Sequence, residues 1–127
     1  ELFLSLKGNL LLMQLQVPES AAPVIDNQSE SQSAKAIRLA GILEYTQRLF
    51  QPPPEADCIR RRAKAAVAEP STVVASWVFE CAHPEQVNLV ETSLFDLLQL
   101  DSIHAVTLPG GQQLMTSEKP SLRLRED

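Results

Sequence analysis

The chain has 127 residues and a mass of 14.0 kDa, which is the size of one folded domain. Hydrophobic residues make up 44% and charged residues 21% of it, which is typical of a globular domain and excludes a disordered one. The formal net charge of -5 argues against a dedicated nucleic-acid binder, because neutralising phosphates requires a basic surface. No run of about 18 apolar residues occurs, so the sequence predicts no membrane span.

The two cysteines, Cys58 and Cys81, are too few for a disulfide framework, and a domain of this size can fold without a bridge. A single bridge between them stays open as an alternative, but we expect free thiols and therefore a cytoplasmic protein. The N-terminal residues are rich in leucine but lack a basic start and a small-residue cleavage site, which argues against a signal peptide. Because the chain begins at Glu1 and not at a methionine, we interpret it as processed or as part of a longer chain.

Residues 2–17 predict a β-hairpin, because Gly8 and Asn9 form a typical two-residue hairpin loop. With this loop, three pairs of apolar side chains face one another on one side of the ribbon: Leu6 with Leu11, Leu4 with Met13, and Leu2 with Leu15. A shift of one residue would destroy this segregation, which fixes the register. The second side is only half polar and carries Phe3, Ser5, Lys7, Leu10, Leu12 and Gln14.

Residues 18–30 are small, polar and proline-containing, and we interpret them as a flexible loop. A first helix is predicted next, since Ser29 and Gln32 match a capping box. Its apolar residues recur at helical spacing up to Phe50: Leu39, Ile42, Leu43, Leu49 and Phe50. Pro54 is suited to the first turn of a second predicted helix, which runs to about Ala68.

Residues 72–80 are the strongest predicted strand, and their two nearly apolar faces predict that it is covered on both sides. A third helix is predicted from His83 and Pro84 to about Leu100, with an apolar arc wider than one buried face needs. Residues 103–108 and 112–116 predict a second hairpin around Pro109, Gly110 and Gly111. The charged C-terminal tail, residues 117–127, is expected to be frayed.

These elements follow the order ββααβαββ and predict a single α+β domain over residues 1–127. A mixed β-sheet carries the helices. The strands at 72–80 and 103–108, together with the helix between them, form a crossover unit, which predicts that the two strands are parallel. The two hairpins are expected to supply antiparallel strands at the edges of the sheet.

Cys81 and His83 lie two residues apart at the end of a predicted strand, where a thiol beside an imidazole could begin a nucleophile–base pair. No oxyanion or third-residue signature accompanies them, so we favour a half-buried cysteine and a helix-capping histidine. Trp77, Cys81, His83 and His104 would line a pocket near the strand ends if the domain bound a small molecule. The spacing of the cysteines and histidines matches no metal-binding pattern, and the sequence predicts no cofactor.

The one basic cluster consists of Arg60, Arg61, Arg62 and Lys64. On the predicted helix it is best explained as a solvated face, with a site for phosphate or for an acidic partner as the alternative.

Apolar residues beyond the needs of one core are the feature that bears most on function. They are Phe3, Leu10 and Leu12 on the second side of the hairpin, and Leu89, Phe95 and Leu100 on the third helix. Such surfaces often bind partners, although they could also close a two-faced core. The sequence thus favours a non-enzymatic interaction or regulatory module that binds a protein partner or a second copy of itself. The alternatives are a small-molecule-binding regulatory domain or cofactor-free enzyme at Cys81 and His83, and nucleic-acid contact through Arg60 to Lys64, which the net charge disfavours.

Overall fold

The computed structural model describes residues 1–23, 31–46, 48–68, 72–108 and 112–123. Its main layer is a six-stranded mixed sheet in the order β4-β5-β2-β1-β7-β8. These strands are β1 (Leu2–Lys7), β2 (Leu10–Pro18), β4 (Cys58–Ala68), β5 (Thr72–Cys81), β7 (Ser102–Leu108) and β8 (Gln112–Thr116). A smaller antiparallel sheet joins β3 (Phe50–Gln51), β6 (Leu89–Thr92) and β9 (Ser121–Arg123). The helices are α1 (Gln32–Tyr45) and α2 (Leu94–Leu97), and three short 3-10 turns are η1 (Glu19–Ala21), η2 (Pro54–Ala56) and η3 (Pro84–Gln86).

The N-terminal hairpin has the predicted register. Leu2, Leu4 and Leu6 of β1 stand opposite Leu15, Met13 and Leu11 of β2. Gly8 in the connecting loop has a φ of 58°, a left-handed conformation that glycine adopts without steric cost. The hairpin lies in the middle of the sheet and not at an edge as expected, because β2 also pairs with β5 and β1 pairs in parallel with β7.

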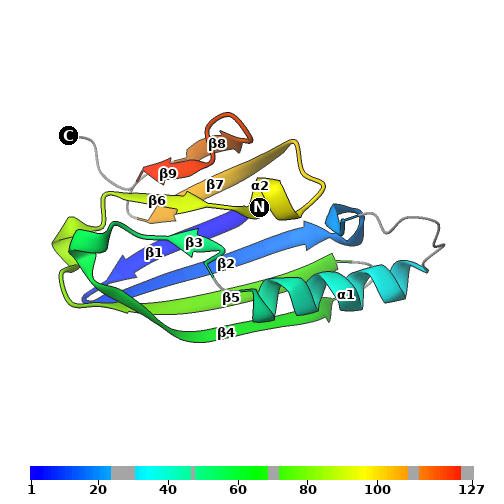
Figure 1. Ribbon diagram of the computed structural model, residues 1–127, viewed down its shortest axis with the longest axis horizontal. Coiled ribbons are helices and arrows are strands. Elements are labelled where there is room, and N and C mark those ends of the chain that lie inside the picture. The colour runs from blue at the N-terminus through cyan, green and yellow to red at the C-terminus, as the bar shows by residue number, and fades with distance from the viewer. Residues whose placement is uncertain (24–30, 47, 69–71, 109–111, 124–127) are drawn as a thin grey trace.

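One face of the larger sheet is covered by α1 and by the smaller sheet, as Figure 1 shows from the covered side. Trp77 of β5 contacts both α1 and the smaller sheet. Its indole N–H donates a hydrogen bond to the Leu43 carbonyl of α1 at 3.2 Å, and its ring meets Phe50 of β3 edge to face, with 4.8 Å between centroids. The buried apolar side chains form one cluster in this space. We call this side of the larger sheet the covered face.

Residues 58–68 form strand β4, so the prediction of a second helix was wrong. Alanine, arginine and lysine have high helix propensity, which is why this segment was predicted to be helical. These preferences amount to less than about 1 kcal/mol per residue, whereas β4 pairs antiparallel with β5 over its whole length. Ala63 and Ala65 pack against the core, and their small side chains let α1 lie close over the strand.

The chain between residues 83 and 100 does not form the single helix that was predicted. It contains η3, β6 and the short α2. Within β6 the buried Val90 and Thr92 flank the exposed Glu91, which is the alternation of a strand. The strand lies between β3 and β9, both distant in sequence, so no local pattern could reveal its partners. The wide apolar arc was the combined pattern of a strand and a short helix.

The first predicted helix is present as α1 but is shorter than predicted. Its N-cap is Ser31, whose hydroxyl oxygen accepts a hydrogen bond from the Ala34 N–H at 3.1 Å; Ser29 lies outside the described residues. The helix ends at Tyr45, so Leu49 and Phe50 are buried but not helical. Its last turn is held by the larger sheet, because Arg60 of β4 donates a hydrogen bond to the Thr46 carbonyl at 3.1 Å.

Two segments expected to be irregular contain packed structure. In the predicted loop at residues 18–30, η1 places Ala21 and Ala22 in the core; residues 24–30 lie outside the described part. In the predicted tail at residues 117–127, β9 pairs with β6; residues 124–127 lie outside the described part of the chain. The predicted turn at Pro109, Gly110 and Gly111 lies outside it as well. Residues distant in sequence order both segments: the Gln99 N–H donates a hydrogen bond to the Ala21 carbonyl, and β6 pairs with β9.

Strand β5 is confirmed, with its predicted alternation. Val73, Ala75, Trp77 and Phe79 are buried on the covered face. The other face of the strand is not covered as predicted, since Ser76 is exposed and Val74 and Val78 are only partly buried. β5 and β7 run in the same direction, but β2 and β1 lie between them in the sheet.

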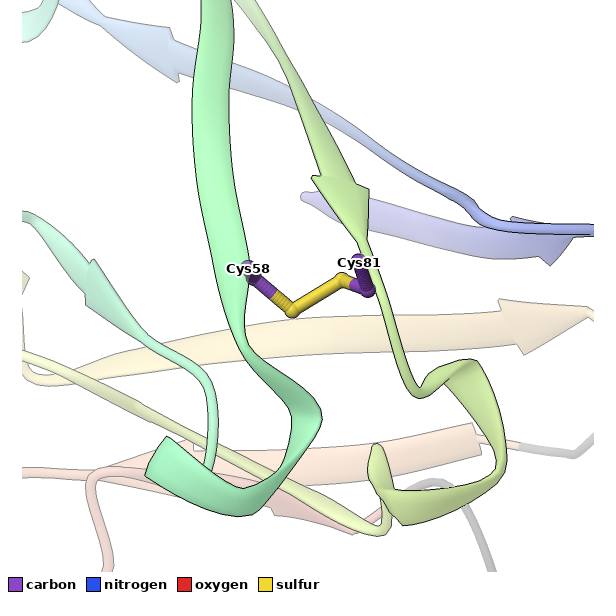
Figure 2. Close-up of a disulfide and its surroundings, with 2 residues drawn as sticks. All are labelled: Cys58 and Cys81. Atoms are coloured by element: carbon purple, nitrogen blue, oxygen red, sulfur yellow. A yellow bond between two sulfur atoms is a disulfide. The ribbon is translucent and has the colours of Figure 1, made fainter.

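Cys58 and Cys81 form a disulfide, so the expectation of free thiols was wrong (Figure 2). The two residues stand opposite each other at the ends of β4 and β5, with 3.9 Å between their Cα atoms. The bridge is a product of strand pairing: once residues 58–68 are a strand antiparallel to β5, the two sulfur atoms meet on the covered face.

Candidate functional site

The second face of the larger sheet, which we call the open face, carries apolar side chains in contact with solvent. Phe3 is 39% exposed and Leu10 is 37% exposed, and Ile59 and Leu114 are more exposed still. Phe3 and Leu10 occupy alternate positions of β1 and β2, whose intervening positions are mostly buried. Both sequence neighbours of Ile59 are only partly buried, and Leu114 lies beside the buried Met115. The second side of the hairpin, which was predicted to carry surplus apolar side chains, is therefore not covered by any other described part of the chain.

A shallow groove of about 230 Å³ lies on this face. Its lining, which is mostly apolar, comes from β1, β2 and β5: Phe3, Leu4, Ser5, Leu12, Met13, Gln14, Ser76, Trp77 and Val78. Leu4, Met13 and Trp77 have their side chains buried on the covered face, so they contribute backbone to the floor. The sequence identified Leu12 and Phe3 but missed Val78 and Ser76, because the pairing of β2 with β5 was not predicted.

The strands bring most of the basic cluster to the same face. Arg62 stands opposite Val78, and Lys64 stands opposite Ser76. Arg61 lies in a bulge, where the register shifts between Arg60 and Arg62, and forms a 2.8 Å ion pair with Glu80 of β5. The cluster is thus a row along the edge of a sheet and not a helix face.

Arg60 does not belong to this row. It stands opposite the buried Phe79, and its guanidinium donates to the Thr46 carbonyl at the end of α1. A cation at the C-terminal end of a helix interacts favourably with the helix dipole. Of the four predicted basic residues, Arg60 therefore stabilises the fold, Arg61 is paired with Glu80, and Arg62 and Lys64 stand on the open face without a salt bridge to another described residue.

The free edge of β4 is partly blocked by α1. The Glu44 carboxylate accepts a hydrogen bond from the Ala65 N–H at 3.0 Å, which occupies a backbone group that another strand would need. This hydrogen bond lowers the pKa of the Glu44 carboxyl below its ordinary value, with smaller contributions from the Tyr45 hydroxyl and the charge of Lys64. The edge of β4 is therefore less accessible to a further strand than an open sheet edge would be.

The other predicted interaction residues lie apart from the open face. Leu89 belongs to β6 and Phe95 to α2 in the layer over the covered face, and Leu100 follows α2. Phe95 and Leu100 pack against the core as partly buried side chains. Phe95 and Leu100 therefore help to close the core, which was the alternative explanation for the surplus apolar surface, whereas Leu89 is only partly buried on β6.

The fold separates the four residues of the predicted pocket. Trp77 and Cys81 are buried on the covered face, and the Cys81 sulfur is bonded to Cys58 (Figure 2). His104 is exposed on the opposite face, with Nδ1 3.7 Å from a Glu1 carboxylate oxygen and Nε2 3.2 Å from Gln112 Oε1. His83 lies beyond the end of β5, 3.7 Å from Glu85. In this arrangement Cys81 offers no thiol to His83.

Two further cavities lie among the described residues. One of about 180 Å³ lies beside the disulfide and includes Arg48, Arg60 and Trp77 in its lining. The other, of about 320 Å³, is polar and lies at the smaller sheet, next to Glu91 and Asp96. Among the described residues, no three histidine, cysteine, aspartate or glutamate side chains gather as a metal site.

No known family model matches the chain, and no curated protein matches it either. In the described part of the chain, no helix has both the length and the hydropathy to cross a membrane.

Proposed function

We propose that the chain is a non-enzymatic binding module that docks a protein partner on the open face of its larger sheet. The observation that carries the proposal is an uncovered, mostly apolar groove flanked by two basic side chains. Apolar surface left exposed on an otherwise well-packed fold commonly marks an interaction site. The groove lies on rigid strands, so it needs no rearrangement to receive a partner.

The size of the groove favours a protein over a small molecule. Pockets that enclose a small ligand usually have a volume of about 300–1,000 Å³ and bury most of its surface, whereas this groove holds about 230 Å³ and is shallow. One or two side chains of a protein surface would fill it. The remaining contacts would come from the flat sheet around it, as in standard interfaces of about 800 Å² per partner.

We also propose that the protein works in an oxidising compartment, in place of the cytoplasmic location expected from the sequence. That expectation depended on free thiols, and stable disulfides are rare in a reducing cytosol. The support is the Cys58–Cys81 bridge. Alkylation of the protein taken from its source cells without reductant should leave both cysteines unmodified. Modification of both thiols would contradict the proposal.

The docking surface can be tested by placing a photo-reactive benzoylphenylalanine at one position at a time in the protein in its source cells. Position 3 lies in the groove, and position 45 is a matched aromatic control, because Tyr45 is 76% exposed on α1. We expect a discrete crosslink to one protein from position 3 and none to that protein from position 45. Equal crosslinking from both positions would contradict the proposal, and a crosslink from position 3 to a second copy would make the partner the chain itself.

A further inference from the structure

Two basic side chains stand on β4, the strand next to the groove. Val78 and Ser76 line the groove, and their neighbours on β4 are Arg62 and Lys64, respectively. Directly opposed residues on adjacent strands have Cβ atoms about 5 Å apart. A group that fills the groove therefore lies within reach of both basic side chains.

The positive charges of these two side chains are not neutralised by a salt bridge within the described residues. Neither Arg62 nor Lys64 forms a salt bridge with another described residue, although Lys64 also attracts Glu44. Arg61, by contrast, is already paired with Glu80. An exposed cation beside apolar surface gains most from a partner that brings a carboxylate and also excludes water.

The open face has the opposite charge balance to the rest of the molecule. Its strand positions carry Lys7, Arg61, Arg62 and Lys64, against the acidic Glu80, with Glu1 beside His104 at the far side. The whole chain has a formal charge of -5. An acidic partner is thus repelled by most of the surface and attracted to this face, which gives both steering and orientation.

We infer that the partner presents an acidic amphipathic helix, with apolar side chains in the groove and carboxylates at Arg62 and Lys64. Residues three or four apart on a helix are neighbours at about 5–6 Å. This matches the step of about 5 Å across the strands from Val78 to Arg62. The carboxylates therefore stand three or four positions from an apolar anchor. This inference depends on the proposed function, since it specifies the chemistry of the same surface.

The test is a selection of 16-residue peptides from a random display library against the disulfide-bonded protein, followed by affinity measurement on variants. The charge variant is Arg62→Glu with Lys64→Glu. Its matched control, Lys35→Glu with Lys119→Glu, changes the net charge equally at positions on α1 and on the turn before β9. The groove variant is Leu12→Gln, since glutamine already occurs on this face at Gln14. The fluorescence of the buried Trp77 confirms that each variant is folded.

We expect selected peptides to combine apolar residues with aspartate or glutamate three or four positions away. The charge variant should weaken their binding about tenfold or more, and the control should leave it within about twofold. Peptides that need Leu12 but carry no acidic residues, and bind the charge variant normally, would overturn this inference and leave the proposed function standing. Peptides that bind the groove variant as well as the wild type would overturn both. Binding at Arg62 and Lys64 of an oligonucleotide or of phosphatidylglycerol vesicles, but not of acidic peptides, would also overturn the inference.

Discussion

Adjacent residues of β2 have opposite environments. Leu11 is fully buried on the covered face, while the next residue, Leu12, lies in the groove of the open face. Period-two alternation made this assignment possible from the sequence for the whole hairpin. What the sequence could not indicate is whether a second layer covers Leu12, because that depends on where distant elements pack.

Alanine substitutions at these two positions form a matched pair. Leu11→Ala should cost about 2–5 kcal/mol of unfolding free energy, because it leaves a cavity in the core. Leu12→Ala should cost less than about 1 kcal/mol, because the side chain borders solvent. Urea unfolding can be followed through Trp77, the only tryptophan. Equal losses at the two positions would contradict a sheet that is covered on one face.

The Glu44 carboxyl is predicted to make stability depend on acid pH. Its pKa is lowered from 4.5, first by the hydrogen bond from Ala65 and then by the Tyr45 hydroxyl and Lys64. Stability from a carboxyl with a depressed pKa is present above its unfolded value and is lost as the pH falls through the folded value. Glu44→Gln should therefore lower the urea midpoint at neutral pH, and the difference from wild type should vanish in acid below the folded pKa. A difference that is constant over this range would show that the charge of Glu44 does not stabilise the edge of β4.

Among the elements, β4 was predicted as a helix, although the positions of the two cysteines are consistent with its pairing with β5. Cys58 lies twelve residues before Pro70 and Cys81 lies eleven residues after it, so the two cysteines are nearly symmetric about this proline in the sequence. The difference of one residue is the bulge between Arg60 and Arg62. Helix propensity hid this symmetry, because it describes single residues and not pairs of strands.

Removing the disulfide tests how much it stabilises the hairpin. The cysteines are 23 positions apart, and closing a loop of this length stabilises a fold by about 3 kcal/mol in the chain-entropy model. The double variant Cys58→Ser with Cys81→Ala should lose about this amount in urea unfolding, with alanine chosen because Cys81 is fully buried. Wild type treated with reductant is the control and should lose a similar amount. A loss of less than about 1 kcal/mol would mean that strand pairing alone fixes β4 against β5.

For the whole molecule, the sequence predicted those parts of the fold that depend on local patterns. The hairpin register, the first helix, strand β5 and the β7–β8 pair all follow from spacing within about 20 residues. The smaller sheet could not be predicted, since β6 pairs with segments that precede and follow it at long range. The candidate site was half predicted for the same reason: Leu12, Arg62 and Lys64 were each identified, but Val78 was not. That β5 places these residues side by side follows from a strand order that only the fold reveals.

The molecule buries one face of its larger sheet in a core, and we propose that the other face docks a partner. Methyl resonances of labelled leucines distinguish the two, because leucines occur on both faces. When a selected peptide binds, we predict that the methyl signals of Leu10 and Leu12 shift, while those of the buried Leu39 and Leu43 stay in place. If the largest shifts fall instead on Leu89 and Leu100, the binding surface lies on the smaller sheet and beside α2, and docking on the open face is contradicted.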